Sequence, residues 1–530
     1  MSTPSSTTTA STQKSAPPTP LAFSTLRKLF WPIHGNEVKK FLPMAVIMFF
    51  ILFNYTLLRN MKDALVITAS GPEVLPFLKA FVILPFSILI VAGYAKLCNI
   101  FDRKTVFYIV ITLFLSVYVT YALFIHPNIE HLHMSPERLK ALKESYPNFQ
   151  HFFSVIANWS SSLFYLCAEL WGATIIGLLF WQFANEVTRV QEARRFYTMF
   201  GLLGHFSLIA AGKLGEFLCD IRHTTATDAE GWSYYINYNV LAISLSGLSI
   251  IVLYWWMNRY VLTDPQYYDE VNKISAKKEA KPKLSLMETV RYISRSRYLG
   301  YILLMVIGYG LSMNLAGILW KKQVQLLFPN PLDYANFLAQ FAYWVGVITI
   351  VLIFFLKGMV ERFGWYKAAM VTPLIVVGTA IPFFTFMFFQ EELSPLLSWS
   401  GCTALTLAVG IGAAQQVLSK SSKYSMFDPT KEMSYIPLDQ ELKVKGKAAV
   451  DVSGYSLAKA SGGYIAGALL VITAAGDLML IAPYLAAIVI GILVVWIIAV
   501  KKLSVLYRGL VNTAKSRDVE TFTSSKIRIK

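Results

Sequence analysis

The sequence predicts an all-α integral membrane protein with twelve transmembrane helices in two six-helix bundles. Its composition is the first reason: of 530 residues, 55% are hydrophobic and 15% are charged, whereas roughly 25% of residues in soluble domains are charged. The second reason is a series of apolar runs, each long enough to cross a bilayer as a helix. The third is one long hydrophilic segment, residues 259–297, which divides these runs six and six.

Twelve apolar runs of about 18–25 residues follow one another, the length that spans a hydrocarbon core. The first six lie near residues 41–58, 75–95, 106–125, 160–183, 197–219 and 238–257. The second six lie near residues 299–320, 335–357, 368–389, 397–418, 452–475 and 479–500. We therefore expect an N-terminal bundle over residues 26–258 and a C-terminal bundle over residues 298–502.

Three further segments flank these bundles. Residues 1–25 are rich in Ser, Thr and Pro and lack the apolar run of a cleaved signal peptide, which predicts a disordered tail. Residues 259–297 form a basic linker, and residues 503–530 form a basic C-terminal tail.

Lysine and arginine gather in alternate loops. Arg103 and Lys104 follow the second run and Arg362 follows the eighth, whereas the loops near Glu391 and Asp477 contain neither residue type. The positive-inside rule then places both termini in the cytoplasm. Because much of the net charge of +17 lies in these short loops, we expect no nucleic-acid partner.

Cysteine and phosphate-loop patterns indicate no resident cofactor. Cys98, Cys167, Cys219 and Cys402 lie far apart without C-x-x-C spacing, so we expect neither a disulfide framework nor a metal site. No G-x-x-x-x-G-K-[ST] motif occurs in the sequence, which argues against a pump with its own ATPase domain.

The two halves of the chain resemble each other. Residues 99–104 (NIFDRK) follow the second run, and residues 360–367 (VERFGWYK) follow the eighth. Acidic and basic residues thus occupy equivalent turns in both halves. Paired halves are typical of major-facilitator-like carriers, in which the substrate site lies between the bundles near mid-membrane.

Ionisable residues within or beside the apolar runs mark candidate site residues, because they are costly in a membrane. Arg59 and Lys62 lie at the outer end of the first helix, Glu169 in the fourth, Lys321 at the end of the seventh and Lys459 in the eleventh. Several cations and few anions favour an anionic substrate, with phosphate groups as the natural ligand.

Structural interpretations of some of these charges remain open. Lys213 and Glu216 are three residues apart and can form a simple helix-surface pair. Lys321 can extend to the interface instead of binding substrate. Lys459 is surrounded by small residues, which suits close helix contact around a cavity.

Several motifs resemble those of the ATP/ADP translocases, the nucleotide transporters of obligate intracellular bacteria and plastids. The resemblance covers residues 27 to about 500 and includes Tyr55–Asp63, Ala168–Gly172, Phe180–Asn185, Trp255–Tyr260, Lys431–Asp439 and Lys443–Ala449.

This resemblance implies nucleotide exchange across a membrane. It matches Lys62, Glu169 and Lys459 to the charged positions needed for transport. Asn185 and Lys447 lie within the resembling motifs, and with Arg59, Lys321 and the matched residues they complete the candidate substrate-binding set. No residue is expected to be catalytic.

Three departures from the family pattern concern the site. The family's I-N-L-V-E is Met313–Gly317 here, so Gly317 replaces a glutamate. L-R-D-T-K-D is Leu58–Asp63, with Asn60 in place of an acid, and G-K-S-G-G is Ala458–Gly463 with sequence AKASGG. Two lost acids make the site more positive and less able to carry a coupling proton, which adds weight to NAD or another nucleotide as an alternative cargo.

We therefore predict a secondary transporter, not an enzyme, which imports host nucleotides by ATP/ADP-type exchange and alternating access. The alternatives within the family are an NAD/ADP exchanger and a proton-coupled nucleoside triphosphate importer. A proton-coupled carrier of another small solute is a more distant alternative. The expected setting is the lipid bilayer of a bacterial inner membrane, with a plastid envelope as the alternative, and the expected state is a monomer.

Overall fold

The structure, a computed structural model, describes residues 31–220, 227–264, 296–356, 359–397, 401–438 and 454–527, with the single residues 27, 267, 447 and 450. These residues form helices joined by short turns, and no strand occurs among them. The predicted tail 1–25 and most of the predicted linker 259–297 lie outside the described residues.

Six membrane-crossing segments build the N-terminal half. The first, fifth and sixth are single helices, α2 (Val38–Ser70), α11 (Val190–Asp220) and α12 (Asp228–Tyr260). The second joins η2 (Pro72–Val74), α3 (Leu75–Phe77), η3 (Leu78–Ile83) and α4 (Leu84–Ile100). The third joins α5 (Arg103–Thr120) and η4 (Tyr121–Ile125), and the fourth joins α9 (Trp159–Trp171), η7 (Gly172–Phe180) and α10 (Trp181–Val187).

Six further segments build the C-terminal half. They are α15 (Arg297–Leu327), α16 (Pro331–Phe355), α17 (Met359–Phe388), α19 (Ala404–Ser422) with η10 (Lys423–Phe427) and α20 (Asp428–Ser434), α21 (Tyr455–Thr473) and α22 (Leu478–Ile527). Polar side chains start several of them: Ser296 accepts from the backbone N–H of Leu299, and Thr403 accepts from that of Thr406. Such caps satisfy donors that a helix start leaves unpaired.

Ten segments of the described chain are long and apolar enough to cross a membrane. The helices α19 and α21, of 19 residues each, bring the number to twelve, as predicted. Over the residues whose side chains are described, α21 is a shorter apolar helix, Ala460–Thr473. In α19 the polar residues Gln415, Gln416 and Lys420 interrupt the apolar sequence. The all-α fold with twelve spans is thereby confirmed.

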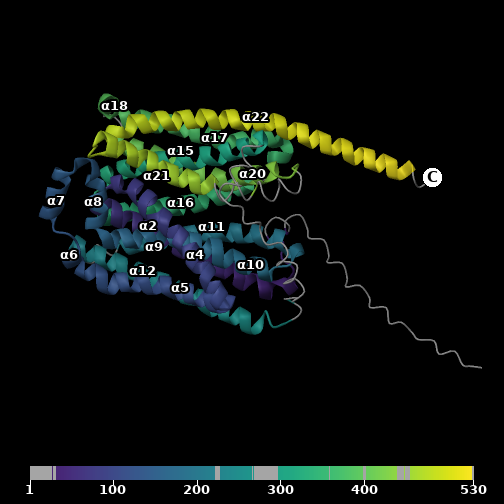
Figure 1. Ribbon diagram of the computed structural model, residues 1–530, viewed down its shortest axis with the longest axis horizontal. Coiled ribbons are helices and arrows are strands. Elements are labelled where there is room, and N and C mark those ends of the chain that lie inside the picture. Colours follow the sequence, from purple (N-terminus) through teal and green to yellow (C-terminus); the bar gives the residue numbers. More distant parts are fainter. Residues whose placement is uncertain are drawn as a thin grey trace, which may run out of the picture.

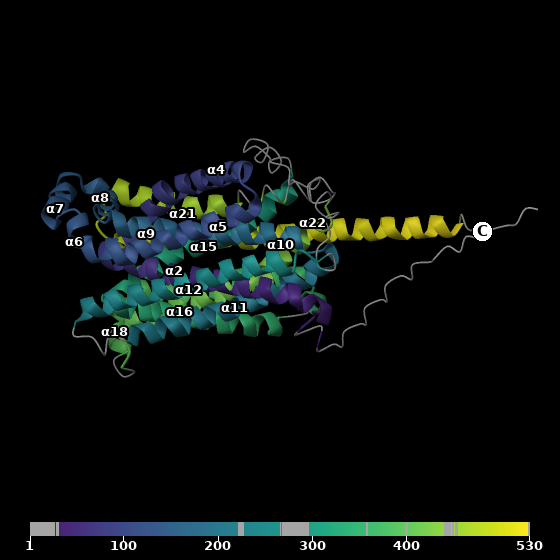
Figure 2. The ribbon, with the colours of Figure 1, turned by 90° about the horizontal axis from the view of Figure 1, so that it is seen from below.

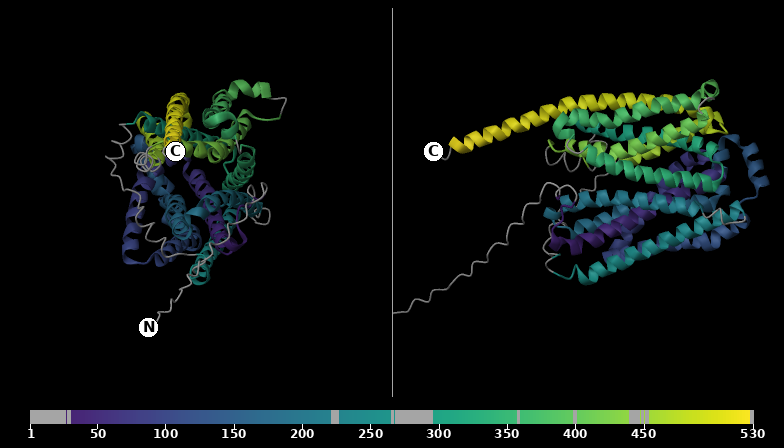
Figure 3. Two further views of the ribbon diagram at one scale, coloured as in Figure 1. Left: turned by 90° about the vertical axis from the view of Figure 1, so that its right-hand side faces the viewer. Right: turned by 180° about the vertical axis from the view of Figure 1, so that it is seen from behind.

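The two halves form two adjacent bundles, the N-terminal one in purple to teal and the C-terminal one in green to yellow (Figure 1). Small helices after α5 cover one end of the molecule: α6 (Ile129–Leu132), α7 (Pro136–Ser145), η6 (Pro147–Phe149) and α8 (Gln150–Ala157). We call residues 129–157 the cap, that end the cap side, and the opposite end, where α2 begins, the tail side. The ribbons of the two bundles meet on the cap side and separate toward the tail side (Figure 3).

The ends of two helices differ from the predicted ones. The first helix, α2, continues to Ser70, twelve residues beyond the predicted end at 58. Hydropathy falls at Arg59–Asp63 although the helix continues, because most of these polar residues are buried inside the protein. The last helix, α22, runs to Ile527 and extends beyond the other helices on the tail side (Figure 2), across much of the predicted tail 503–530.

Glycines allow close contact between the bundles. A Cβ on Gly212 of α11 would lie 2.7 Å from the backbone of Ala339 and Tyr343 in α16. A Cβ on Gly463 of α21 would lie 3.1 Å from the carbonyl oxygen of Pro76. These contacts join α11 to α16 and α21 to α3 and η3.

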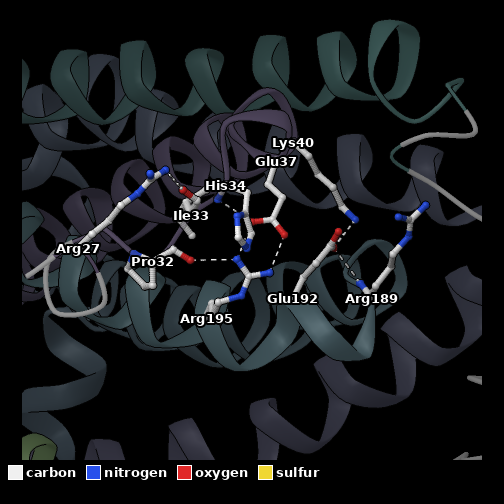
Figure 4. A network of polar contacts seen from close by, with 9 residues as sticks. All are labelled: Arg27, Pro32, Ile33, His34, Glu37, Lys40, Arg189, Glu192 and Arg195. Atoms are coloured by element: carbon white, nitrogen blue, oxygen red, sulfur yellow. Dashed lines mark hydrogen bonds and ion pairs between the residues drawn. The ribbon is translucent and has the colours of Figure 1, made fainter. Parts of the chain in front are cut away.

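A polar network attaches the start of α2 to α11 within the N-terminal bundle (Figure 4). Arg195 forms two hydrogen bonds with the Glu37 carboxylate, of 2.7 and 2.6 Å, and one with the carbonyl oxygen of Pro32. Lys40 Nζ lies 2.7 Å from Glu192 Oε2, and both residues are buried. The network fixes the tail-side end of α2, the helix that carries the site residues described next.

Candidate functional site

A central cavity of about 400 Å³ lies between the two bundles. The N-terminal bundle contributes residues of α2, η3 and α9, and the C-terminal bundle contributes residues of α15, α16 and α19. Its lining consists of Tyr55, Arg59, Asn60, Lys62, Asp63, Lys79, Tyr165, Glu169, Tyr309, Gly310, Met313, Asn314, Gly317, Ile318, Trp320, Lys321, Leu338, Phe341, Gln416 and Lys420. Ligand pockets are commonly about 300–1,000 Å³, so the volume suits a small organic molecule.

Basic residues outnumber acidic ones in this lining. The five cations are Arg59, Lys62, Lys79, Lys321 and Lys420, and the two anions are Asp63 and Glu169. The lining thus carries three more positive than negative groups. Charges away from water are costly unless compensated, and an anionic ligand would compensate this excess.

Lys62 is at the centre of the charged group in the N-terminal bundle. Its Nζ lies 3.0 Å from Asp63 Oδ1 and 3.0 Å from Glu169 Oε1. The same ammonium lies 3.6 Å from the centre of the Tyr165 ring, a cation–π contact. Only 2% of Lys62 is exposed, so these partners hold a buried ammonium in one position.

Two lysines of the lining contact the opposite bundle. Lys321 of α15 lies 2.7 Å from Asp63 Oδ2 of α2. Lys79 of η3 donates a hydrogen bond of 2.5 Å to Asn314 Oδ1 of α15. The polar cavity wall is therefore continuous across both bundles, and a ligand that competes for these lysines also acts on the contact between the bundles.

The remaining two cations have aromatic neighbours. The Arg59 guanidinium lies 6.0 Å from the centre of the Tyr55 ring, and Lys420 Nζ lies 4.6 Å from that of Phe341. Neither cation forms an ion pair with a carboxylate among the residues that the structure describes. They are the groups most available to an incoming anion.

Widened helical turns adjoin three charged residues of the cavity. The π-helical segment η3 contains Lys79, η7 begins three residues after Glu169, and η10 begins three residues after Lys420. Gly172 starts η7, and a Cβ there would lie 2.7 Å from the Tyr55 ring. Such turns are frequent at functional sites because they redirect side chains.

Beyond the cavity, ion pairs close the cap side. Lys322 Nζ lies 2.8 Å from Glu73 Oε1 of the N-terminal bundle and 2.8 Å from Asp477 Oδ2 of its own bundle. The backbone N–H of Leu478 also donates to Glu73 Oε1, at 3.3 Å. Since Glu73 is only 5% exposed, this carboxylate of one bundle is held by groups of the other.

The cap itself joins the C-terminal bundle. Asn148 Nδ2 donates to the carbonyl oxygen of Val471 at 2.7 Å, and His151 Nε2 donates to that of Ala475 at 2.8 Å. Gln325 of α15 donates to the carbonyl oxygen of Ile67 at 2.9 Å. These contacts all lie on the cap side, where the ribbons of the bundles meet (Figure 3).

Comparison with models of known protein families shows which family this chain matches. The model of the TLC ATP/ADP transporter family matches residues 18–507.

The chain belongs to the TLC ATP/ADP transporter family.

Several relatives of this TLC transporter are named ADP,ATP carrier proteins. It is 40% identical over 490 residues to ADP,ATP carrier protein 1 of Chlamydia pneumoniae, covering 92% of this chain and 94% of that one. It is 41% identical to ADP,ATP carrier protein 1 of Rickettsia bellii, covering 93% and 98%. It is 37% identical to the chloroplastic ADP,ATP carrier protein 2 of Arabidopsis thaliana, covering 93% and 79%. The resemblance predicted from the motifs is confirmed.

Solved structures support the fold of this TLC transporter. A bacterial homologue of the iron transporter ferroportin, in an inward-facing state, aligns with a TM-score of 0.55 at 12% identity, covering 91% of this chain and all of that one. The D-xylose–proton symporter aligns with a TM-score of 0.50 at 12% identity, covering 88% and 97%. At such identities the likeness concerns the fold alone, and it agrees with the predicted major-facilitator-like architecture.

The structure brings four of the predicted site residues of the TLC transporter to one cavity: Arg59, Lys62, Glu169 and Lys321. Arg59 and Lys62 lie well inside α2 rather than at its end. Lys459 belongs to α21, but its side chain lies outside the described residues.

Two predicted residues lie elsewhere. Asn185 is exposed near the tail-side end of α10 and accepts a hydrogen bond of 2.6 Å from the Tyr197 hydroxyl. Lys447 forms an ion pair with Glu432 of α20 and does not line the cavity. We predicted both as site residues because they lie in motifs that resemble the family, but such motifs contain structural residues as well as binding residues.

The sequence prediction missed Asp63, Lys79 and Lys420. Lys79 lies inside the second apolar run and Asp63 adjoins Lys62, so the cost of a charge in a membrane could have marked both. Lys420 lies two residues beyond the predicted end of the tenth helix, where it resembled an ordinary loop lysine.

Proposed function

We propose that this protein exchanges ATP and ADP across a membrane and thereby imports host nucleotide by alternating access. The observation that supports this most is the excess of cations in a cavity lined by both bundles, in a chain of the TLC ATP/ADP transporter family. The named relatives are ADP,ATP carriers. The protein acts as a carrier and carries out no chemistry on its cargo.

Lysine and arginine side chains bind the phosphate groups in this proposal. Lys62, Lys79 and Lys321 present ammonium groups from both bundles, and Arg59 and Lys420 add the two cations with aromatic neighbours. Lysine acts as a point charge on phosphate oxygens, and arginine can form two parallel hydrogen bonds. Lys459 of α21 is proposed as a further phosphate ligand from the C-terminal bundle.

The ion pairs of the two cavity carboxylates, Asp63 and Glu169, favour exchange over proton symport. Asp63 lies within 3.0 Å of Lys62 and 2.7 Å of Lys321, and Glu169 lies 3.0 Å from Lys62. Ammonium partners at these distances stabilise the ionised carboxylates. A carboxylate that stays ionised does not carry a proton across the membrane.

We further propose that the tail side faces the cytoplasm of a bacterial inner membrane, with both termini on that side and a monomer as the working unit. The distribution of lysine and arginine in alternate loops supports this orientation. The contacts of Lys322, Asn148 and His151 then close the outer side. The conformation described here is the inward-facing one.

Binding by the purified protein tests the nature of the cargo. We expect ADP and ATP to raise the thermal stability of the detergent-solubilised protein, since a ligand at 100 times its Kd stabilises by about 2.7 kcal/mol. The variant Lys420→Met removes a cavity cation without breaking an ion pair among the described residues, and it should weaken this stabilisation.

The surface variant Lys140→Met serves as a control, because the Lys140 side chain is 79% exposed and its ion-pair partner, Glu144, lies on the same cap helix. It should respond to ADP as the wild type does. Stabilisation by NAD but not by ATP or ADP would make the protein an NAD carrier. Stabilisation by none of these nucleotides, with intact protein, would contradict the proposed function.

A further inference from the structure

One corner of the cavity has uncharged polar lining. Gln416 of α19 and Gly317 of α15 face each other there: a Cβ on Gly317 would lie 3.5 Å from Gln416 Nε2 and 3.9 Å from Gln416 Oε1. Lys420 follows one turn later on α19 and also lines the cavity. This corner therefore adjoins the cations without being part of the charged group.

The side-chain nitrogen of Gln416 has no hydrogen-bond partner in the described part of the chain. The residue is 4% exposed, so this donor is buried. A buried donor that stays unpaired is costly, and nearly all such groups in proteins are paired. A ligand with a suitably placed acceptor would pair this one.

The glycine at position 317 leaves the amide accessible to a ligand. Gly317 has no side chain. A Cβ built at this position would have the Gln416 amide as its nearest neighbour, so the glycine leaves the space in front of that amide open. A longer side chain at 317 would occupy the space in front of that amide. The neighbouring Gln415 is also fully buried, and its amide has no hydrogen-bond partner among the described residues, but Gln415 does not line the cavity.

We propose that Gln416 recognises the adenine base of the cargo and makes the carrier prefer adenine over guanine nucleotides. This inference rests on the proposed nucleotide exchange. The cations take the phosphates, which leaves the base as the group for the uncharged corner.

The hydrogen-bonding pattern of a carboxamide supports this assignment. It presents one donor beside one acceptor, and adenine presents its N6 amino donor beside a ring nitrogen acceptor, so both bonds form together. Guanine presents O6 and N7, two acceptors, on the corresponding edge. One of the two bonds is then lost and two oxygens oppose each other.

Exchange of ATP and GTP against internal ADP, measured in proteoliposomes, tests the assignment. The wild type should have a lower KM for ATP than for GTP. In Gln416→Ala the ratio of the two kcat/KM values should fall by about 5- to 150-fold, the range for one base contact with two hydrogen bonds. Gln416→Glu should shift the preference toward GTP, because a carboxylate accepts from the N1–H and N2–H donors of guanine.

Gln415→Ala is the matched control: it removes an equally buried amide outside the cavity and should leave the ratio unchanged. A test without mutation uses purine riboside diphosphate, which lacks the N6 amino group. It should compete with labelled ADP for the wild-type protein about 5- to 150-fold less well than unlabelled ADP.

Equal wild-type rates for ATP and GTP, or an unchanged ratio in Gln416→Ala, would overturn the role of Gln416 while nucleotide exchange stands. Equal competition by purine riboside diphosphate would do the same, even if the Gln416 variants fail to fold. Absence of any nucleotide exchange by the wild type would instead overturn the proposed function together with this inference.

Discussion

At the scale of single residues, the site depends on how Lys62 is held. A lone buried ammonium would be costly, but Asp63, Glu169 and the Tyr165 ring surround it at 3.0, 3.0 and 3.6 Å. Three partners fix the position of the charge without removing it. In the proposed function an incoming phosphate therefore meets an ammonium that is already oriented, which lowers the entropic cost of binding.

We predict that Lys62→Met slows ATP/ADP exchange by about 10- to 150-fold, since hydrogen bonds to charged groups contribute about 1.5–3 kcal/mol. Lys62→Arg should retain part of the activity because it keeps the charge. Exchange rates in proteoliposomes, corrected for the amount of inserted protein, measure both effects.

The comparison for this variant is Lys213→Gln. Lys213 also lies in a membrane-crossing helix, but its side chain is 58% exposed and its ion pair with Glu216, at 2.7 Å, stays on one helix. It also contacts the Tyr343 ring of the opposite bundle, which is 4.6 Å away and outside the cavity lining. Exchange by Lys213→Gln should stay within about twofold of the wild type, since exposed pairs contribute about 0–1 kcal/mol. Normal exchange by well-folded Lys62→Met would exclude Lys62 from the site.

At the scale of elements, the sequence predicted the helices better than their ends. Apolar runs identified twelve spans, including α19, which the polar residues Gln415, Gln416 and Lys420 interrupt. The same method ended α2 at 58, because it treats Arg59–Asp63 as solvent-facing. Hydropathy cannot separate a polar residue that faces water from one that faces a buried cavity, and so it fails at the site itself.

The contact between α21 and the second span depends on glycine. A Cβ on Gly463 would lie 3.1 Å from Pro76 O and 3.2 Å from Lys79 Cβ, whereas one on Gly467 would lie 3.6 Å from Pro76 Cβ. The distances at Gly463 are tighter than ordinary van der Waals contact, whereas the distance at Gly467 is an ordinary one. The two glycines therefore form a matched pair on one helix.

We predict that Gly463→Ala reduces exchange about fivefold or more, because overpacking costs about 1–3 kcal/mol and here opposes closure of the cap side. Gly467→Ala should exchange at nearly the wild-type rate. The initial rates of both variants, with protein amounts matched, test this difference. Equal rates for the two variants would show that the close approach of α21 and η3 plays no part in transport.

At the scale of the whole molecule, contacts between the bundles decide which side is open. The order of the apolar runs and the long segment after the sixth run predicted two sets of six helices. No sequence pattern predicted that Lys322 meets Glu73, because 249 residues separate them and only the packed bundles bring them together. The same holds for the cavity, whose walls come from six segments of the two bundles.

His151 makes the closed cap side sensitive to pH. Burial lowers the pKa of this imidazole, and this effect outweighs the hydrogen bond to Ala475 and the Glu73 carboxylate, which raise the pKa, while Lys143 and Lys322 lower it further. The closed state thus binds a proton more weakly than a state in which His151 is solvated. The neutral His151 therefore stabilises the closed state fully at a pH above the ordinary histidine pKa. This contribution is lost as the pH falls through the lowered pKa of the closed state.

We predict that acidification increases amide hydrogen exchange in residues 147–157, after correction for the intrinsic pH dependence of the chemistry. The increase should begin below about pH 6.5, the ordinary pKa of histidine, and be much smaller in His151→Gln. Hydrogen exchange with mass spectrometry measures both. An identical pH dependence in the variant would remove His151 from the closure of the cap side.

The central claim, that the basic cavity carries nucleotide by exchange, is tested most directly by uptake of labelled ATP into proteoliposomes that are either empty or preloaded with ADP. We predict fast uptake into preloaded vesicles and little into empty ones, insensitive to collapse of a proton gradient. Equal uptake into empty vesicles that is abolished with the proton gradient would make the protein a symporter and contradict this account.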